Sequence, residues 1–225
     1  MKAVVVLAAA GRGERLQARV PKALLQLAGR PLMHFALRSI DACPELQGVI
    51  VAAPSDGWRE VLDLAKKSAK LIDVVEGAGT RSGSIRNALK AVPAEFDTVV
   101  SHDVARPFAS PALFTAVLRA LDGADGAVPT LPVHDTVKRV DGALIAETVP
   151  RDGLALAQTP QAFRRDVLEA AHRAAALDEF EGTDDAAVVE RAGYRVVVVP
   201  GEVANLKVTT AADLTMAASL AGLGG

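Results

Sequence analysis

Several features that define whole classes of protein are scarce or missing in this 225-residue sequence. A single cysteine, Cys43, excludes an intrachain disulfide and a zinc site built on paired cysteines. No apolar run reaches the roughly 20 residues that a membrane span requires. Neither sign of charge is in excess, because 25 basic residues face 27 acidic ones, so no broad basic face for nucleic acid is expected. We therefore expect a cytoplasmic protein that binds neither membrane nor nucleic acid.

Hydrophobic residues, by contrast, are plentiful and make up 50% of the chain, enough to bury a substantial core. We expect a single domain over residues 1–225, with no second enzyme fused to it. The apolar run at 3–10 is short and leads into a charged, glycine-rich turn. This pattern is typical of a buried strand and not of a signal peptide.

Short β-branched runs alternate along the chain with longer amphipathic stretches. The alternation predicts an α/β fold, a Rossmann-like and mostly parallel sheet flanked by helices. The best-marked helix starts at Ser110-Pro111, because Ser caps free amides and Pro suits the first turn, and it is expected to reach about Leu121. Strands are expected at 3–7, 49–53, 71–75, 98–101, 127–131 and 194–199, and further helices at 31–42 and 58–69.

The pattern changes after residue 132. Two short runs, 136–140 and 143–149, flank the turn dipeptide Asp141-Gly142, which predicts a β-hairpin set apart from the alternation. A hairpin with little sheet around it is marginally stable alone, so we expect a projecting arm at about 133–155 that is buried against a partner subunit. An ordinary surface hairpin is the alternative interpretation.

The first expected strand runs into a glycine-rich turn. Gly11 and Gly13 let main-chain amides approach an anion closely, while the small Ala9 and Ala10 leave room for a nucleotide. Three residues after Gly13, a dinucleotide-binding fingerprint would require a third glycine and a Walker loop a Gly-Lys pair, and neither is present. What remains is either an anion-binding turn of another kind or a turn with a purely structural role.

Two further segments follow expected strands. Asp103 comes at the end of one, at the sheet edge where open α/β folds bind ligands, so its carboxylate is placed to hold Mg²⁺ against nucleotide phosphates. A helix cap or turn residue is the structural alternative. The turn containing Ala78, Gly79 and Ser84 offers backbone groups and a hydroxyl that can read the amine and carbonyl of a pyrimidine. Its alternative is a flexible turn followed by a helix cap.

These segments carry a family resemblance. With Arg15 and Lys22 added, the glycine-rich turn resembles the signature loop of sugar-nucleotide and polyol-phosphate nucleotidyltransferases. The segment 101–107 closely resembles the His-Asp-Ala-Ala-Arg-Pro segment of the 2-C-methyl-D-erythritol 4-phosphate cytidylyltransferases, with Val104 in place of one alanine. Weaker motifs of that family recur in order over essentially the whole chain, at Asp135-Thr136, Arg151, 158–161, 183–186 and 205–209.

The resemblance implies an Mg²⁺-dependent enzyme that joins CMP from CTP to a polyol phosphate and releases pyrophosphate. Arg15 and Lys22 would neutralise charge on the α-phosphorus and on the departing pyrophosphate. The turn at 77–84 would read cytosine through the main chain near Ala78 and Gly79 and the side chain of Ser84, and Asp103 would hold the metal. The implied contacts to the polyol phosphate are Arg106, Thr136, Arg151, Thr183 and Lys207.

The family's arm is exchanged between the two subunits of a homodimer. By the resemblance, Thr136 and Arg151 would therefore reach the neighbouring active site, where Arg151 would position the polyol phosphate together with Lys207. His102 has a simpler interpretation, as a buried packing residue.

Two alternatives of different kinds stay open. Ribitol 5-phosphate cytidylyltransferases share the fold, the nucleotide loop and the Asp-x-x-Arg-Pro pattern, although Arg151 and the segments 157–161 and 205–209 favour methylerythritol phosphate. A non-catalytic nucleotide-binding module is the other alternative. A sensor would not require Lys22 and Lys207 together with Arg15 and Asp103, because these are groups suited to a transition state.

Overall fold

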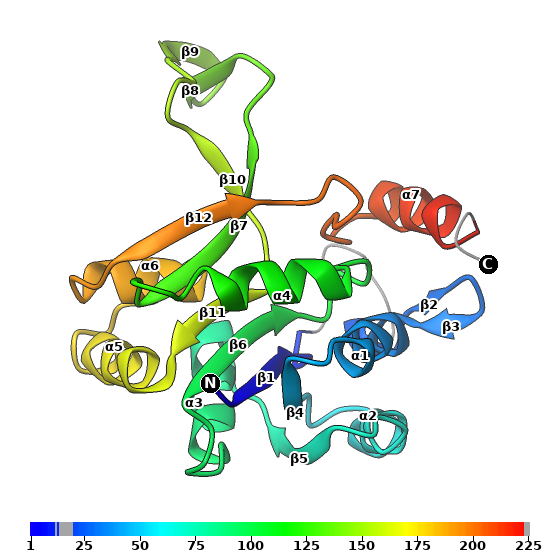
Figure 1. Ribbon diagram of the computed structural model, residues 1–225. Helices are drawn as coiled ribbons and strands as arrows, with labels where there is room; N and C mark the ends of the chain where they lie inside the picture. The colour runs from blue at the N-terminus through cyan, green and yellow to red at the C-terminus, as the bar shows by residue number, and fades with distance from the viewer. Residues whose placement is uncertain (12, 14–19, 223–225) are drawn as a thin grey trace.

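The computed structural model in Figure 1 describes residues 1–11, 13 and 20–222. Its largest sheet is mixed and has eight strands. Six of them correspond to the six strands expected from the sequence, although the last begins two residues later than expected. They are β1 (Ala3–Ala8), β4 (Leu46–Ala53), β5 (Leu71–Glu76), β6 (Thr98–Asp103), β7 (Gly126–Pro132) and β12 (Val196–Pro200). The other two are the short strands β10 (Ala155–Ala157) and β11 (Gln161–Arg164).

The strand order is β10-β7-β11-β6-β1-β4-β5, with β12 added beside β7. Strand β1 is parallel to both β4 and β6, β4 is parallel to β5, and β12 is parallel to β7. The short strands β10 and β11 run antiparallel to the strands beside them, β10 to β7 and β11 to both β6 and β7. The expected α/β fold with a mostly parallel sheet is confirmed. The two antiparallel strands were not expected, because three or four residues are too few to show a strand pattern in the sequence.

Helices cover the two faces of the sheet (Figure 1). The expected helix at 58–69 ends early, at Ala65, because tighter turns follow in which the amides of Lys67 and Ser68 donate to the carbonyls three residues before them, at 3.2 and 2.9 Å. The helices are α1 (Leu32–Ala42), α2 (Trp58–Ala65), α3 (Arg81–Lys90), α4 (Pro111–Arg119), α5 (Arg165–Leu177), α6 (Asp185–Arg191) and α7 (Ala211–Gly222), with the 3-10 turn η2 (Lys22–Leu24) and the short strands β2 (Gln26–Leu27) and β3 (Arg30–Pro31).

Two hydrophobic cores sandwich the sheet. Successive side chains of a strand point to opposite faces, so β1 contributes Val5 and Leu7 to one core and Val4 and Val6 to the other. Helices α1, α2 and α4 close the first core, and α3, α5 and α6 close the second. The unbroken apolar run of β1 thus reflects a central strand that is buried on both faces.

The predicted hairpin forms as β8 (Val137–Asp141) and β9 (Leu144–Val149), which pair antiparallel in a separate two-stranded sheet. In Figure 1 it stands away from the central sheet, beyond β10. Val140, Leu144 and Ile145 expose most of their apolar surface there. Its predicted burial against a partner subunit stays a prediction. Among the residues that the structure describes, no helix combines the length and hydrophobicity that a membrane crossing requires.

Candidate active site

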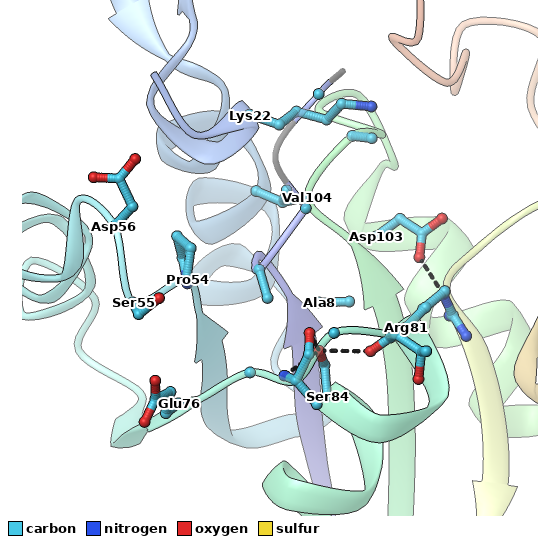
Figure 2. Close-up of a pocket in the computed structure, with 18 of the residues that line it drawn as sticks. Ala8, Lys22, Pro54, Ser55, Asp56, Glu76, Arg81, Ser84, Asp103 and Val104 are labelled. Atoms are coloured by element: carbon cyan, nitrogen blue, oxygen red, sulfur yellow. Dashed lines mark hydrogen bonds and ion pairs between the residues drawn. The ribbon is translucent and has the colours of Figure 1, made fainter. Parts of the chain in front are cut away.

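A cavity of about 780 Å³ lies where β1, β4, β5 and β6 end, at the carboxyl edge of the parallel strands. This is the edge at which open α/β sheets bind their ligands. Five chain segments meet around it, and Figure 2 shows labelled residues from four of them. Among the described residues, the lining comprises Ala8, Ala10, Gly11, Gly13, Lys22, residues 54–56 and 76–81, Ser84, residues 103–105, Lys207 and Thr209.

The glycine-rich turn after β1 supplies one wall of the cavity. Gly13 has a φ of 70°, in the left-handed region that favours glycine, and a Cβ added at Gly11 would meet none of the described residues within 4 Å. The amide of Lys22 donates to the Gly11 carbonyl at 3.1 Å, which closes the turn. The Lys22 ammonium donates to the Val208 carbonyl at 3.0 Å, next to Lys207. Arg15, the other predicted catalytic cation of this segment, lies outside the described residues.

The predicted pyrimidine-reading turn forms the opposite wall. Thr80 caps α3 by accepting from the Gly83 amide at 3.0 Å. The Ser84 hydroxyl accepts from the Ala78 amide at 2.9 Å and donates to the Thr80 carbonyl at 2.9 Å, as the dashed lines around Ser84 in Figure 2 illustrate. Ser84 therefore shapes the turn, while its predicted contact to cytosine stays a prediction, as do those of Ala78 and Gly79.

The Asp103 carboxylate is held between two cations at the end of β6. One oxygen accepts from Arg81 Nε at 3.0 Å and the other lies 2.7 Å from Lys207 Nζ. The residue is only 7% exposed. Burial opposes ionisation, but Arg81 and Lys207 outweigh it and hold the pKa of the Asp103 carboxyl well below its ordinary value. Asp103, the predicted metal ligand, is thus in direct contact with Lys207, a predicted substrate-binding residue.

Arg81 also contacts a second carboxylate, which lies in the protein interior. Its Nη2 lies 2.9 Å from an oxygen of Asp185, which is 0% exposed. The other Asp185 oxygen lies 2.9 Å from Nε2 of the buried His172. Burial opposes ionisation of the Asp185 carboxyl as well, and Arg81 followed by His172 lowers its pKa. Neither Arg81 nor Asp185 was predicted as a site residue, although both lie inside motifs that the sequence displays.

A hydrogen-bonded chain fixes the main chain of Asp103. Its amide donates to the Thr159 hydroxyl at 3.0 Å, and Thr159 Oγ lies 3.0 Å from His102 Nδ1. The His102 Nε2 lies 3.2 Å from the Arg106 carbonyl. Burial lowers the pKa of His102 to about 4, so the ring is neutral at pH 7. The partners then assign the proton to Nε2, which donates to the carbonyl, while Nδ1 accepts from Thr159. His102 is a packing residue, as expected, with a structural hydrogen-bonding role in addition.

The segment that carries Lys207 is held by main-chain contacts. The amide of Val208 donates to the Ala105 carbonyl at 2.8 Å. Arg106 donates to the carbonyls of Asn205 at 2.8 Å and Ala157 at 3.1 Å. Arg106 is not among the described residues that line the cavity, so its predicted contact to the polyol phosphate stays a prediction.

Three predicted substrate residues belong to chain segments that do not contribute to the described lining of this cavity. Thr136 and Arg151 bracket the hairpin, and the Arg151 guanidinium donates to the His134 carbonyl at the hairpin base. Thr183 lies two residues before α6. None of the three is among the described lining residues. Within one chain the structure thus brings Lys22, Asp103 and Lys207 together but not Thr136, Arg151 and Thr183.

The fold and the position of the cavity are those of an α/β nucleotide-binding protein. Comparison with known proteins identifies the family. The sequence model of IspD, 2-C-methyl-D-erythritol 4-phosphate cytidylyltransferase, matches residues 3–222. The chain therefore belongs to the IspD family.

Individual relatives agree with this assignment. The 2-C-methyl-D-erythritol 4-phosphate cytidylyltransferase of Frankia casuarinae is 42% identical over 97% of this chain and 81% of its own length. The crystal structure of the corresponding Thermus thermophilus enzyme is 34% identical with a TM-score of 0.81, covering 99% of this chain and 100% of that one. The 4-diphosphocytidyl-2C-methyl-D-erythritol synthase of Anaerococcus prevotii superposes with a TM-score of 0.86 at 29% identity, covering 98% of each chain.

Proposed function

We propose that this protein transfers CMP from CTP to 2-C-methyl-D-erythritol 4-phosphate and releases pyrophosphate. The observation that carries the proposal is the contact between Asp103 and Lys207 in a cavity that the glycine-rich turn also lines. Membership of the IspD family supports the choice of both substrates. No specific observation favours ribitol 5-phosphate.

The chemistry demands little covalent work from the protein. The attacking group is a phosphate oxygen that is already ionised at neutral pH, so no general base is needed, and the protein has to align the reactants and offset negative charge. The obstacle is repulsion, because two unit charges about 4 Å apart cost about 4 kcal/mol at an effective dielectric of about 20. Lys22 and Lys207 supply positive charge at the cavity, and we assign the in-line attack on the α-phosphorus to the space between them.

We further propose that Asp103 holds Mg²⁺ together with the nucleotide phosphates. Its carboxylate is ionised and lines the cavity, and the oxygen that contacts Lys207 would be open to a hard cation once Lys207 turns to the substrate phosphate. Among the described residues there is no cluster of three or more metal-binding side chains, so the phosphates would complete the coordination, as is usual for Mg²⁺. The bound ion would supply neutralising charge on those phosphates. Turnover should stop in EDTA and return when excess Mg²⁺ is added.

A homodimer with exchanged hairpins is the assembly we propose. It is supported by the exposed apolar side chains Val140, Leu144 and Ile145 and by the position of Thr136 and Arg151 outside the described lining of their own cavity. In such a dimer these two residues would complete the partner's substrate pocket. Turnover per chain should then fall when the protein is diluted below its dimer dissociation constant.

Pyrophosphate release tests the proposed reaction most directly. CTP, UTP and ATP are each combined with 2-C-methyl-D-erythritol 4-phosphate and with ribitol 5-phosphate. We expect release with CTP and the erythritol substrate, at a kcat/KM at least tenfold above every other pair. Equal rates with ribitol 5-phosphate would reject the substrate assignment. CTP binding without any pyrophosphate release would identify a nucleotide-binding module instead.

A further inference from the structure

Arg81 connects three parts of the molecule: the nucleotide turn, the end of β6 and the start of α6. It is the first residue of α3, directly after the nucleotide turn. Its Nε contacts Asp103 at the end of β6 at 3.0 Å, and Figure 2 shows this side chain reaching across to the carboxylate. Its Nη2 contacts Asp185 at 2.9 Å, at the first residue of α6 and two residues after Thr183.

We propose that Arg81 is a positioning residue of the transfer reaction, which orients the Asp103 carboxylate and couples the nucleotide turn to the segment that carries Thr183. The inference rests on the proposed cytidylyl transfer. It assigns Arg81 no contact with either substrate.

Asp103 needs a side-chain anchor even though its main chain is already fixed. Thr159 holds the Asp103 amide, but rotation of the carboxylate is restrained by its two cations, Arg81 and Lys207. Lys207 is assigned to the polyol phosphate, and its side chain is 42% exposed. Once Lys207 shares its charge with a substrate, Arg81 is the partner that keeps the carboxylate oriented.

The anchor is held from the protein interior. Asp185 is fully buried, and its second oxygen is bound by Nε2 of His172, itself a core residue of α5. The Arg81 guanidinium donates a hydrogen bond to Asp103 through Nε and forms an ion pair with Asp185 through Nη2, and its rigid planar fork keeps these two nitrogens directed at different carboxylates. A lysine at this position would carry the same charge on one compact ammonium, so it could not reproduce the two contacts together.

A conservative exchange, Arg81→Lys, therefore tests the proposal while the charge is kept. We expect the variant to fold and kcat to fall about 100-fold, the effect typical of a misplacement of about 1 Å. The KM for CTP should stay within about threefold, because the nucleotide turn keeps its own hydrogen bonds. The Mg²⁺ concentration at half-maximal rate should rise about tenfold, because the metal carboxylate is no longer oriented.

Arg86→Lys is the matched control. Arg86 lies on the same helix and forms an ion pair with Glu181 at 3.6 Å, but it is not among the described lining residues. Its kcat, KM and Mg²⁺ dependence should match those of the wild type. A kcat of Arg81→Lys within about threefold of the wild type, or a lower melting temperature with unchanged kinetics, would overturn the positioning role.

Two further measurements keep the test decisive. If Arg81→Lys does not fold, Asp185→Asn removes the buried partner of Arg81 instead. This variant should lower kcat about tenfold with an unchanged KM for CTP. An unchanged kcat in Asp185→Asn would overturn the proposal. A crystal structure of Arg81→Lys should show the Asp103 carboxylate in a new orientation. If the wild type releases no pyrophosphate, the proposed function fails, and an unmoved Asp103 in that crystal structure would separately refute the positioning role.

Discussion

Gly77 holds the nucleotide turn so close to the end of β1 that one added methyl group should disturb the cavity. Its amide donates to the Ala53 carbonyl at 2.8 Å. A Cβ at this position would collide with the Cβ of Ala10 and lie 3.0 Å from the Ser84 hydroxyl and 3.2 Å from the Ala53 carbonyl oxygen. These neighbours are a short side chain, a bonded hydroxyl and main chain, so none can swing aside.

Gly77→Ala should therefore push the turn away from β1 by about 1 Å, and a shift of that size costs about 100-fold in catalytic efficiency. The overpacking itself should cost about 1–3 kcal/mol of folding free energy. Pyrophosphate release at varied CTP concentration measures the first effect, and urea unfolding measures the second. We expect kcat/KM for CTP to fall by a larger factor than the fraction of unfolded protein accounts for.

Gly126→Ala separates overpacking from damage to the cavity. Gly126 lies in β7, where a Cβ would collide with the fully buried ring of Phe163 and lie 3.3 Å from Val196, and it is not among the described lining residues. This variant should lose stability of the same order but keep kcat/KM for CTP within about threefold. Wild-type efficiency in Gly77→Ala, or an equal loss in both variants, would refute the steric reasoning.

Three other predictions address charge, protonation and assembly. Lys207→Met should lower kcat about 100-fold to 1000-fold in the pyrophosphate assay, because it removes a preorganised cation, whereas the surface variant Lys2→Met should not. The pKa of His102 in the folded protein, about 4, lies below its ordinary 6.5, so the unfolded chain binds the proton first and stability falls as the pH drops through this window. Through His102 alone, acidification from pH 7 to pH 5 should thus lower the free energy of unfolding by about 2 kcal/mol, so the loss should shrink by about that amount in His102→Gln and be retained in the exposed His134→Gln, as urea titrations at the two pH values measure. Leu144→Asp should weaken the proposed dimer and lower turnover per chain together, as followed by sedimentation and assay across a dilution series; a fully active monomer would contradict the proposed exchange of hairpins.

Local patterns in the sequence were sufficient for much of the fold. The apolar run of β1, the Ser110-Pro111 start of α4 and the Asp141-Gly142 turn each predict a structure that forms. In each case the signal lies in a few consecutive residues, through side-chain alternation, capping or turn chemistry. The position of Asp103 at the edge of the sheet follows from the same local reasoning, since a strand precedes it.

Which side chains contact one another at that edge of the sheet was decided by the tertiary structure alone. Arg81 lies 22 residues before Asp103 and still further from Asp185 in the chain, so no local sequence pattern predicts either ion pair. The direction of the Arg106 guanidinium toward main-chain carbonyls and the role of Thr159 beneath Asp103 likewise depend on strands brought together by folding. The sequence by itself determined which segments become strands and which residues end them, because those choices depend on neighbours in the chain. Which charges are paired, and how deeply they are buried, was settled only when distant segments packed together, because ion pairing and desolvation depend on distances in space.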